Sequence, residues 1–585
     1  MSVRLSSLLL FALATCAVPA RQARAQDRQL IAVETGPAPS VLEREFEGEE
    51  WGCARFQSAE ADHWWSCQGD RFLARPAWVL PLGAETVAAA QVALTSALAR
   101  ESDPEALECL LLALACAAPR DPDVFAQLMT RTRASDPRLR ATAALALGCT
   151  RRRDAVPTLL QLLADSDQEA RTRAFAGYGL ALALEGALGS ETEHDVLRAA
   201  RAILEAPNPD IDIETAAVHM LRGLRIEAST AGGAALRDMA LQVLWSYHDR
   251  DDRARVVARG HVAAAVVSLL RRGGDVAAAG RLRLAQAIWR ADDRHEWLLG
   301  VGAAQALGAL CEGQPCPAVE GALQAYAERG RNWQARGLAR LSLGRIGSDA
   351  AIGFLLGDLR AQGEARDEMD LGWTALALGV TAHLARSERR QPAADAIGAA
   401  LLDAVQRSPR SRGERLLTSL GLSGYQPAGP WLCDLVRQRG GVDQILEMAA
   451  TGLALLGEPR ALAVLPRPSG LVRRPSVFQG VVHARACLGD SSVVDELKAH
   501  AAAGRNVALR SAAMRLLAEV GGDDGVRALL AMLSDPEPLS RALAASGLAI
   551  ALVGGSPLAE LRCDVNYRLP PPSLSNMTDG VLDLW

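Results

Sequence analysis

The sequence is poor in aromatic residues and almost without lysine. Aromatic residues make up 4% of the 585 residues and hydrophobic residues 49%, so a core must be built mainly from Ala, Leu and Val. Small aliphatic side chains suit closely packed helices better than sheets. Lys498 is the only lysine, and it follows Leu497, so the Gly-Lys pair of a phosphate-binding loop is absent.

A strong excess of charge is also missing. The formal net charge is −5, from 63 basic and 68 acidic residues. This small balance argues against a protein whose whole surface grips a polyanion, and we expect no nucleic-acid partner. We attribute the use of Arg in place of Lys to GC-rich coding.

Long apolar runs are absent beyond the first residues, because Arg, Asp or Glu interrupts each later stretch of Ala and Leu. No transmembrane segment is therefore expected. Residues 1–25 combine Arg4, an apolar run from Leu8 to Val18 and the small-residue motif Ala23-Arg24-Ala25, which predicts a cleaved signal peptide. We expect an exported bacterial protein that is periplasmic, envelope-associated or secreted. A lipid anchor at Cys16 is the alternative to this cleavage.

Removal of the signal leaves ten of the 11 cysteines in an oxidising compartment. Cys53 and Cys67 lie in an irregular segment and are the first candidate disulfide. Cys311 and Cys316 flank the loop sequence Glu-Gly-Gln-Pro and are the second. The motif Cys-x-x-Cys is absent, so a zinc ribbon and a thioredoxin-type site are not supported.

Local catalytic motifs are missing as well. The nine histidines are scattered, no His-Glu-x-x-His occurs, and the one His-Glu pair, His295-Glu296, is interpreted as part of a charged turn. The segment Gly421-Leu422-Ser423-Gly424 does not have the Gly-x-Ser-x-Gly form of a nucleophile elbow. We therefore expect no catalytic, cofactor-binding or metal-binding residues, and no cofactor.

What the sequence does contain is a repeat, clearest between Ser135 and Leu180. Arg140 and Arg171 are 31 residues apart, and an acidic residue precedes each by four positions. Arg510 and Arg541, near the C-terminal end, are also 31 residues apart, and Asn506 and Glu537 precede them by four positions. A fixed period filled by two short amphipathic helices predicts a solenoid. We expect these residues to hydrogen-bond within and between neighbouring repeats, and we call them the repeat ladder: Asp136, Arg140, Asp167, Arg171, Asn506, Arg510, Glu537 and Arg541.

Helix boundaries can also be predicted. Apolar spacing favours helices over 85–99, 104–117, 123–130, 154–163, 168–185, 195–204 and 213–224, with Asp103 capping the second. Glycines 457, 489 and 521 step by 32, and each is expected at a helix end in the left-handed conformation.

The motif Asp-Pro-x-Leu-Arg-x-x-Ala-x-x-Ala-Leu-Gly, followed by Ala-Val-Pro-x-Leu-Leu-x-Leu-Leu, resembles HEAT repeats, in particular the short class named after phycobilin lyases. The resemblance is strongest at 135–181 and 505–550. It implies an all-α solenoid of HEAT-like helical hairpins. It also implies that second helices such as Leu139–Leu147 and Leu509–Leu517 line a concave face, where an unidentified protein or peptide partner would bind.

The predicted organisation is a signal peptide (1–25), a linker (26–40), a Trp/Cys-rich N-terminal cap module (41–82), the solenoid (83–556) and a Pro-rich C-terminal tail (557–585). The cap module is expected because the end of a solenoid must be covered to stay soluble. It holds four of the 11 tryptophans, which form an alternative candidate partner surface: Trp51, Trp64, Trp65 and Trp78.

Three functions are compatible with this organisation. The first is an exported protein-interaction scaffold without catalytic activity, because repeats build extended binding surfaces. The second is an enzyme like the phycobilin lyases that the repeat class resembles. The third is binding of envelope glycan or cell wall through the tryptophans of the cap module.

Overall fold

A computed structural model of the chain describes residues 82–552, apart from short gaps at 185–189, 208–209, 225, 227–229, 253–254, 272–275, 295, 362–367, 408–415, 473–474 and 504–506. All described residues belong to the second of two compact units, Met1–Ser40 and Val41–Trp585. Every regular element among them is a helix, which confirms the predicted all-α solenoid. None of these helices is long and apolar enough to cross a membrane.

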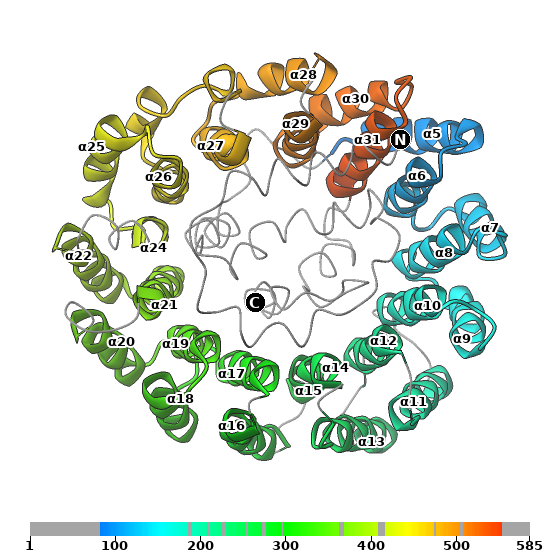
Figure 1. Ribbon diagram of the computed structural model, residues 1–585, viewed down its shortest axis with the longest axis horizontal. Helices are drawn as coiled ribbons and strands as arrows, with labels where there is room; N and C mark the ends of the chain where they lie inside the picture. Colours follow the sequence, from blue (N-terminus) through cyan, green and yellow to red (C-terminus); the bar gives the residue numbers. More distant parts are fainter. Residues whose placement is uncertain are drawn as a thin grey trace, which may run out of the picture. The chain divides into compact units, whose positions relative to one another are not determined.

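Within this unit the helices form two concentric rows (Figure 1). The outer row consists of α5 (Ala84–Arg100), α7 (Pro122–Arg131), α9 (Val156–Ala164), α11 (Ser190–Glu205), α13 (Ala231–His248), α16 (Val276–Arg294), α18 (Pro317–Arg329), α20 (Asp349–Ala361), α22 (Gln391–Arg407), α25 (Ala428–Arg439), α28 (Val493–Ala503) and α30 (Gly522–Met532). The inner row consists of α6 (Pro104–Ala117), α8 (Pro137–Cys149), α10 (Ala170–Ala183), α12 (Ile211–Gly223), α14 (Val256–Gly260), α15 (Val262–Leu270), α17 (Trp297–Leu310), α19 (Trp333–Ile346), α21 (Glu368–Ser387), α24 (Leu417–Leu422), α26 (Asp443–Leu456), α27 (Pro475–Cys487), α29 (Val507–Val520) and α31 (Pro538–Leu552).

Capping residues start several helices where the sequence predicts. The Asp103 side chain accepts a hydrogen bond from the backbone N–H of Ala106 at 3.0 Å, and Asp136 accepts one from Arg138 at 2.8 Å. Each aspartate is followed by a proline at the first helical position, where a missing N–H costs nothing. In the next repeat the predicted start is early, because α10 begins at Ala170, with Glu169 and not Asp167 as its N-cap.

Left-handed glycines end several helices. Gly347, Gly457 and Gly489 have φ angles of 64°, 66° and 99°, as expected of a helix C-terminus. The prediction for Gly521 is wrong. Its φ is −82°, and the following residue, Gly522, takes the left-handed conformation with φ of 53°.

Neighbouring inner helices approach each other at their backbones. A Cβ atom on Gly148 of α8 would lie 2.4 Å from the Cα of Gly179 of α10, and one on Gly421 of α24 would lie 2.3 Å from the Cα of Gly452 of α26. These approaches bury the inner helices deeply. Twelve consecutive residues of α6, Ala106–Ala117, are no more than 8% exposed.

The last hairpin packs on the first, so the helical rows close into a ring. Helix α31 lies against α6 and α30 against α5 (Figure 1). The Asp523 carboxylate at the start of α30 accepts a hydrogen bond from the backbone N–H of Gly83 at 3.2 Å, across 440 residues of sequence. We call this junction the seam. The predicted cap module lies outside the described residues, and the hairpin end face that it was expected to cover is occupied by α30 and α31.

We expect Gly148→Ala to lower stability, although alanine favours helix, because the added methyl group meets the backbone of α10. Overpacking of this kind costs about 1–3 kcal/mol. The matched control is Gly357→Ala on the exposed side of α20, where a Cβ atom meets nothing within 4 Å and a gain of about 0.5–1 kcal/mol is expected. Denaturant unfolding measures both. A neutral or stabilising Gly148→Ala would contradict close backbone packing.

Candidate functional site at the seam of the ring

Arg541 in the last hairpin forms an ion pair with Glu101 in the first hairpin. Arg541 of α31 donates to both carboxylate oxygens of Glu101, from Nε at 2.6 Å and from a terminal nitrogen at 2.8 Å. Its other terminal nitrogen donates to the backbone carbonyls of Asp535 and Pro536. The Glu101 side chain is only 4% exposed. The Arg541 hydrogen bond lowers the pKa of Glu101 to about 2, against the opposing effect of burial.

A similar arginine contact joins consecutive hairpins within the solenoid. Arg336 of α19 donates to the carbonyls six and five residues earlier, of Gly330 and Arg331, and to Asp370 of the following hairpin at 3.2 Å. Arg140 of α8 likewise donates to the carbonyls six and five residues before it. The seam is therefore one more repeat interface, formed between hairpins at opposite ends of the described sequence.

The other ladder residues are used less uniformly than predicted. Arg510 pairs with Glu537 of the next hairpin at 2.7 Å, as a ladder between repeats would. Arg171 reaches back to Glu108 of α6 at 3.3 Å. The backbone N–H of Asp167 donates to Asp165 within a turn. Asn506 lies outside the described residues.

Buried acids connect three successive inner helices. Glu108 of α6 is fully buried and contacts Arg138 of α8 at 2.8 Å and Arg171 of α10. In α19 the fully buried Arg340 pairs with Asp358 at 2.8 Å and Asp370 at 3.3 Å. A buried guanidinium suits this role because its several donors satisfy more than one partner.

A further buried network lies where the repeat is irregular. Arg259, 1% exposed, donates to Glu296 at 2.7 Å and to the His248 carbonyl. His219 and His261 are both buried, with 3.3 Å between Nε2 of His219 and Nδ1 of His261. Burial lowers the pKa of both imidazoles, that of His261 to about 3.

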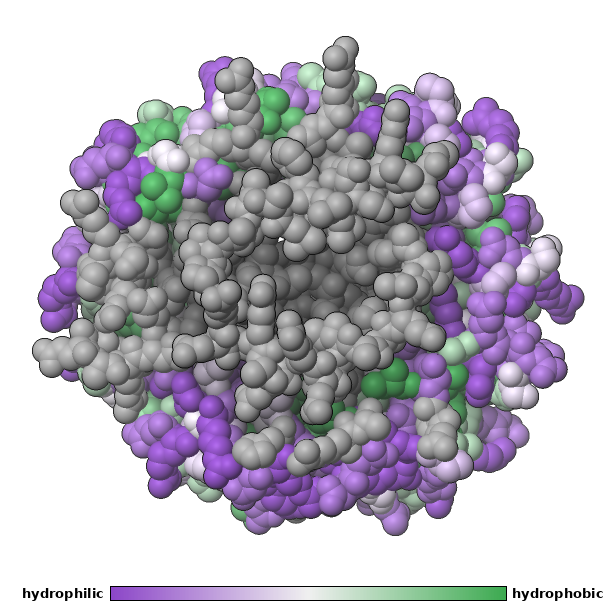
Figure 2. All heavy atoms as spheres, in the orientation of Figure 1, coloured by the Kyte–Doolittle hydropathy of each residue, from purple (hydrophilic) through white to green (hydrophobic). Residues whose placement is uncertain are grey.

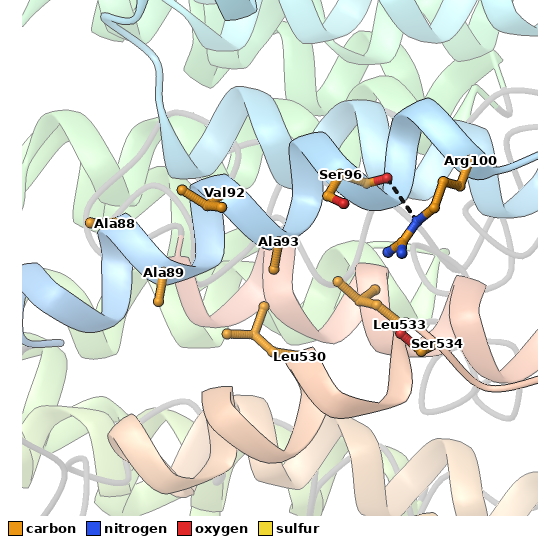
Figure 3. A pocket seen from close by; sticks show the side chains of 9 residues that line it. All are labelled: Ala88, Ala89, Val92, Ala93, Ser96, Arg100, Leu530, Leu533 and Ser534. Atoms are coloured by element: carbon orange, nitrogen blue, oxygen red, sulfur yellow. Dashed lines mark hydrogen bonds between the residues drawn. The ribbon is translucent and has the colours of Figure 1, made fainter.

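A shallow groove of about 540 Å³ runs along the seam between the outer helices α5 and α30. Its lining is mainly apolar, with Ala88, Ala89, Val92 and Ala93 from α5 and with Leu530 and Leu533 from the other side; Ala89 and Ala93 point towards Leu530 (Figure 3). Further residues at one end are polar: Ser96, Arg100 and Ser534.

The apolar floor of the groove is accessible to solvent. The Val92 side chain is 70% exposed, more than any other large hydrophobic among the described residues. The coloured residues around the rim of the ring are mainly hydrophilic (Figure 2).

Other predicted site residues are apart from the seam. Cys311 ends α17 and Cys316 precedes α18; both are thiols, and burial raises the pKa of the Cys311 thiol to about 12. Their disulfide stays a prediction. The remaining predicted positions lie outside the described residues: Cys16, Cys53, Cys67, Trp51, Trp64, Trp65 and Trp78. In the part of the chain that is described, no three His, Cys, Asp or Glu side chains form a group that could hold a metal ion.

The sequence analysis did not identify Arg336 and Glu101 as site residues, for different reasons. Arg336 has Asn332 four positions before it, which is the ladder spacing, so a search for that spacing would have found it. Glu101 has no such signal, because its partner Arg541 is 440 residues away and the pairing exists only when the ring closes.

We expect Glu101→Arg and Arg541→Glu each to destabilise the chain by about 2–3 kcal/mol, because each places like charges at a half-buried junction. The double swap Glu101→Arg/Arg541→Glu should recover most of this loss. Thermal unfolding measures the effect, with charge reversal at the exposed Asp251 as the control. Additive losses in the double variant would show that the two side chains do not act as a pair.

Acid should destabilise the chain through the buried imidazoles. His219 and His261 are neutral in the folded chain and take up protons more readily in the unfolded chain. The free energy of unfolding therefore falls as the pH drops below the ordinary histidine pKa of about 6.5, towards the lowered pKa of His261 at about 3. Each contributes a slope of about 1.4 kcal/mol per pH unit. His261→Gln should make the fall in unfolding free energy shallower, whereas Tyr178→Phe, beside His219, should not. An unchanged slope in His261→Gln would contradict the assignment.

Comparison with known proteins identifies the repeat but no full-length relative. Residues 92–181 match the HEAT repeats family. No curated protein matches the sequence. Among solved structures, a Kap95:Nup1 complex is similar at 14% identity over 91% of this chain and 69% of that chain, with a TM-score of 0.40. A Kap121p mutant matches at 12% identity, 92% and 72% coverage, and a TM-score of 0.36.

Human deoxyhypusine hydroxylase in complex with glycerol matches at 18% identity over 59% of this chain and 98% of that chain, with a TM-score of 0.21. The phycobilin-lyase subclass stays a prediction. The helical hairpins of residues 92–181 are thus HEAT repeats, as the motif at Ser135–Leu180 predicted.

Proposed function

We propose that this chain is an exported bacterial scaffold that binds another protein through its outer helices and has no catalytic activity of its own. Stacked helical hairpins build large, preformed surfaces of the kind used for protein recognition. Export rests on the predicted signal peptide at residues 1–25.

The observation that carries the proposal is the contrast between the two helical rows of a closed ring. The inner helix α6 buries Ala106–Ala117 without interruption, whereas the outer helix α7 buries only Val124 and Leu128. The outer helix α30 buries only Gly525, Val526 and Leu529. Among the described residues, the outer helices therefore offer more exposed surface to a partner than the inner helices do, and we infer that a partner binds there; the concave face stays the alternative site.

Ring closure gives these outer helices fixed relative positions. The bidentate Arg541–Glu101 pair and the Asp523–Gly83 hydrogen bond join the two ends. A partner that contacts several outer helices at once gains from this preorganisation, because little ordering remains to be done on binding.

The proposal is tested by immobilising the exported chain and capturing proteins from envelope extract over a series of salt concentrations. We expect at least one protein to be retained and then to bind when purified. Binding should weaken in Arg541→Glu, which destabilises the seam, and return in the Glu101→Arg/Arg541→Glu swap. Failure to retain any protein at every salt concentration would contradict the scaffold role, and equal binding by Arg541→Glu would contradict the need for closure.

A further inference from the structure

The seam groove has an exposed apolar floor and no described side chain over it. The α5 side is built from three successive turns, with Val92 in the middle, and the α30 side from its last turn. Ala88, Ala89 and Val92 are all exposed. Exposure of a Val side chain to 70% leaves apolar area that a neighbouring hydrophobic segment would bury favourably.

The first described residues, Leu82 and Gly83, lie at the end of the groove where α5 and α30 begin. Leu82 packs against the core, and the backbone N–H of Gly83 is held by Asp523 at the start of α30. Residues that precede Leu82 therefore leave the described structure beside both groove helices.

The distances allow the preceding segment to turn back into the groove. Trp78 lies four residues before Leu82 and can be no more than about 14 Å from it. Ala88 is about 6 Å along α5 from the first helical residue, Ala84, and the whole helix is about 25 Å long. A tether this short holds the segment at an effective concentration of the order of millimolar, so weak apolar contacts are enough.

The composition of that segment matches the groove. Residues 71–80 read Arg-Phe-Leu-Ala-Arg-Pro-Ala-Trp-Val-Leu, and the apolar group Trp78–Leu80 is nearest to α5. A single Trp side chain buries 150–250 Å². No end face of the solenoid is left for Trp78 to cap, because α30 and α31 already cover α5 and α6.

Charge favours one position within the groove. Arg75 would be repelled by Arg100 at the far end of α5. The near end carries Glu85 in the first turn of α5 and Asp523 and Asp524 in the first turn of α30, where Asp524 is paired with Arg527. Arg75 is therefore better placed towards this end than beside Arg100.

We propose that Trp78–Leu80 docks on Ala88, Ala89 and Val92 in the seam groove and fastens the ring across α5 and α30. The segment is an intramolecular latch: it buries the exposed apolar floor and adds contacts to the junction made by Arg541 and Glu101. This proposal depends on ring closure and is independent of the scaffold function.

A photo-cross-linking amino acid at position 92 of the full chain tests the latch. We expect cross-links from position 92 to residues 71–80 of the same molecule, identified by mass spectrometry. The control is the same amino acid at Leu282 of α16, which is 60% exposed and distant in sequence, and which should not reach residues 71–80. Cross-links from position 92 to a second copy, to the C-terminal tail or to no protein segment would each overturn the proposal.

A second pair of variants separates docking from folding. Trp78→Asp/Leu80→Asp should abolish the cross-link from position 92 while the circular dichroism of the helices stays unchanged. Val92→Asp in the unlabelled chain should increase amide exchange at residues 78–80 several-fold. Persistence of the cross-link in the double aspartate variant, or unchanged exchange in Val92→Asp, would overturn the proposal.

Discussion

The interface between consecutive hairpins is the constraint on which the rest of the structure depends. Inner helices meet through glycine backbones such as Gly148 and Gly179, and an arginine then joins the turn before its own helix to an acid of the adjacent hairpin. Because consecutive hairpins stack in the same way, a small rotation per hairpin accumulates along the chain. The accumulated rotation brings the last hairpin to the first, where Arg541 makes to Glu101 the contact that Arg336 makes to Asp370.

Closure changes which surfaces of the solenoid matter. An open solenoid has two end faces that need covering and a concave face that is free to bind. In the closed arrangement α30 and α31 cover α5 and α6, and the inner helices bury nearly all their residues. The accessible features are then the outer helices and the groove between α5 and α30, where an apolar floor is left exposed. Buried charges such as Glu108 and Arg259 are paired, which suits a role in fixing the packing of successive helices.

Much of the fold is predictable from local sequence. Asp103 caps the helix that the pattern assigns to it, and Gly457 and Gly489 end helices in the left-handed conformation. The error at Gly521 arises because two glycines are adjacent and either can take that conformation. Ring closure is not predictable in this way, because it depends on the sum of many small rotations. Glu101 was therefore missed, and the N-terminal cap and the concave partner surface stay predictions.

The distance between the two ends of the solenoid tests the central claim most directly. Spin labels on non-natural amino acids at Glu85 of α5 and Asp524 of α30, both exposed, report this distance by pulsed electron resonance in the full chain. Closure predicts a single short and narrow distance, because axes of packed helices lie about 8–10 Å apart. A long or broad distribution would show an open solenoid and contradict the closed ring.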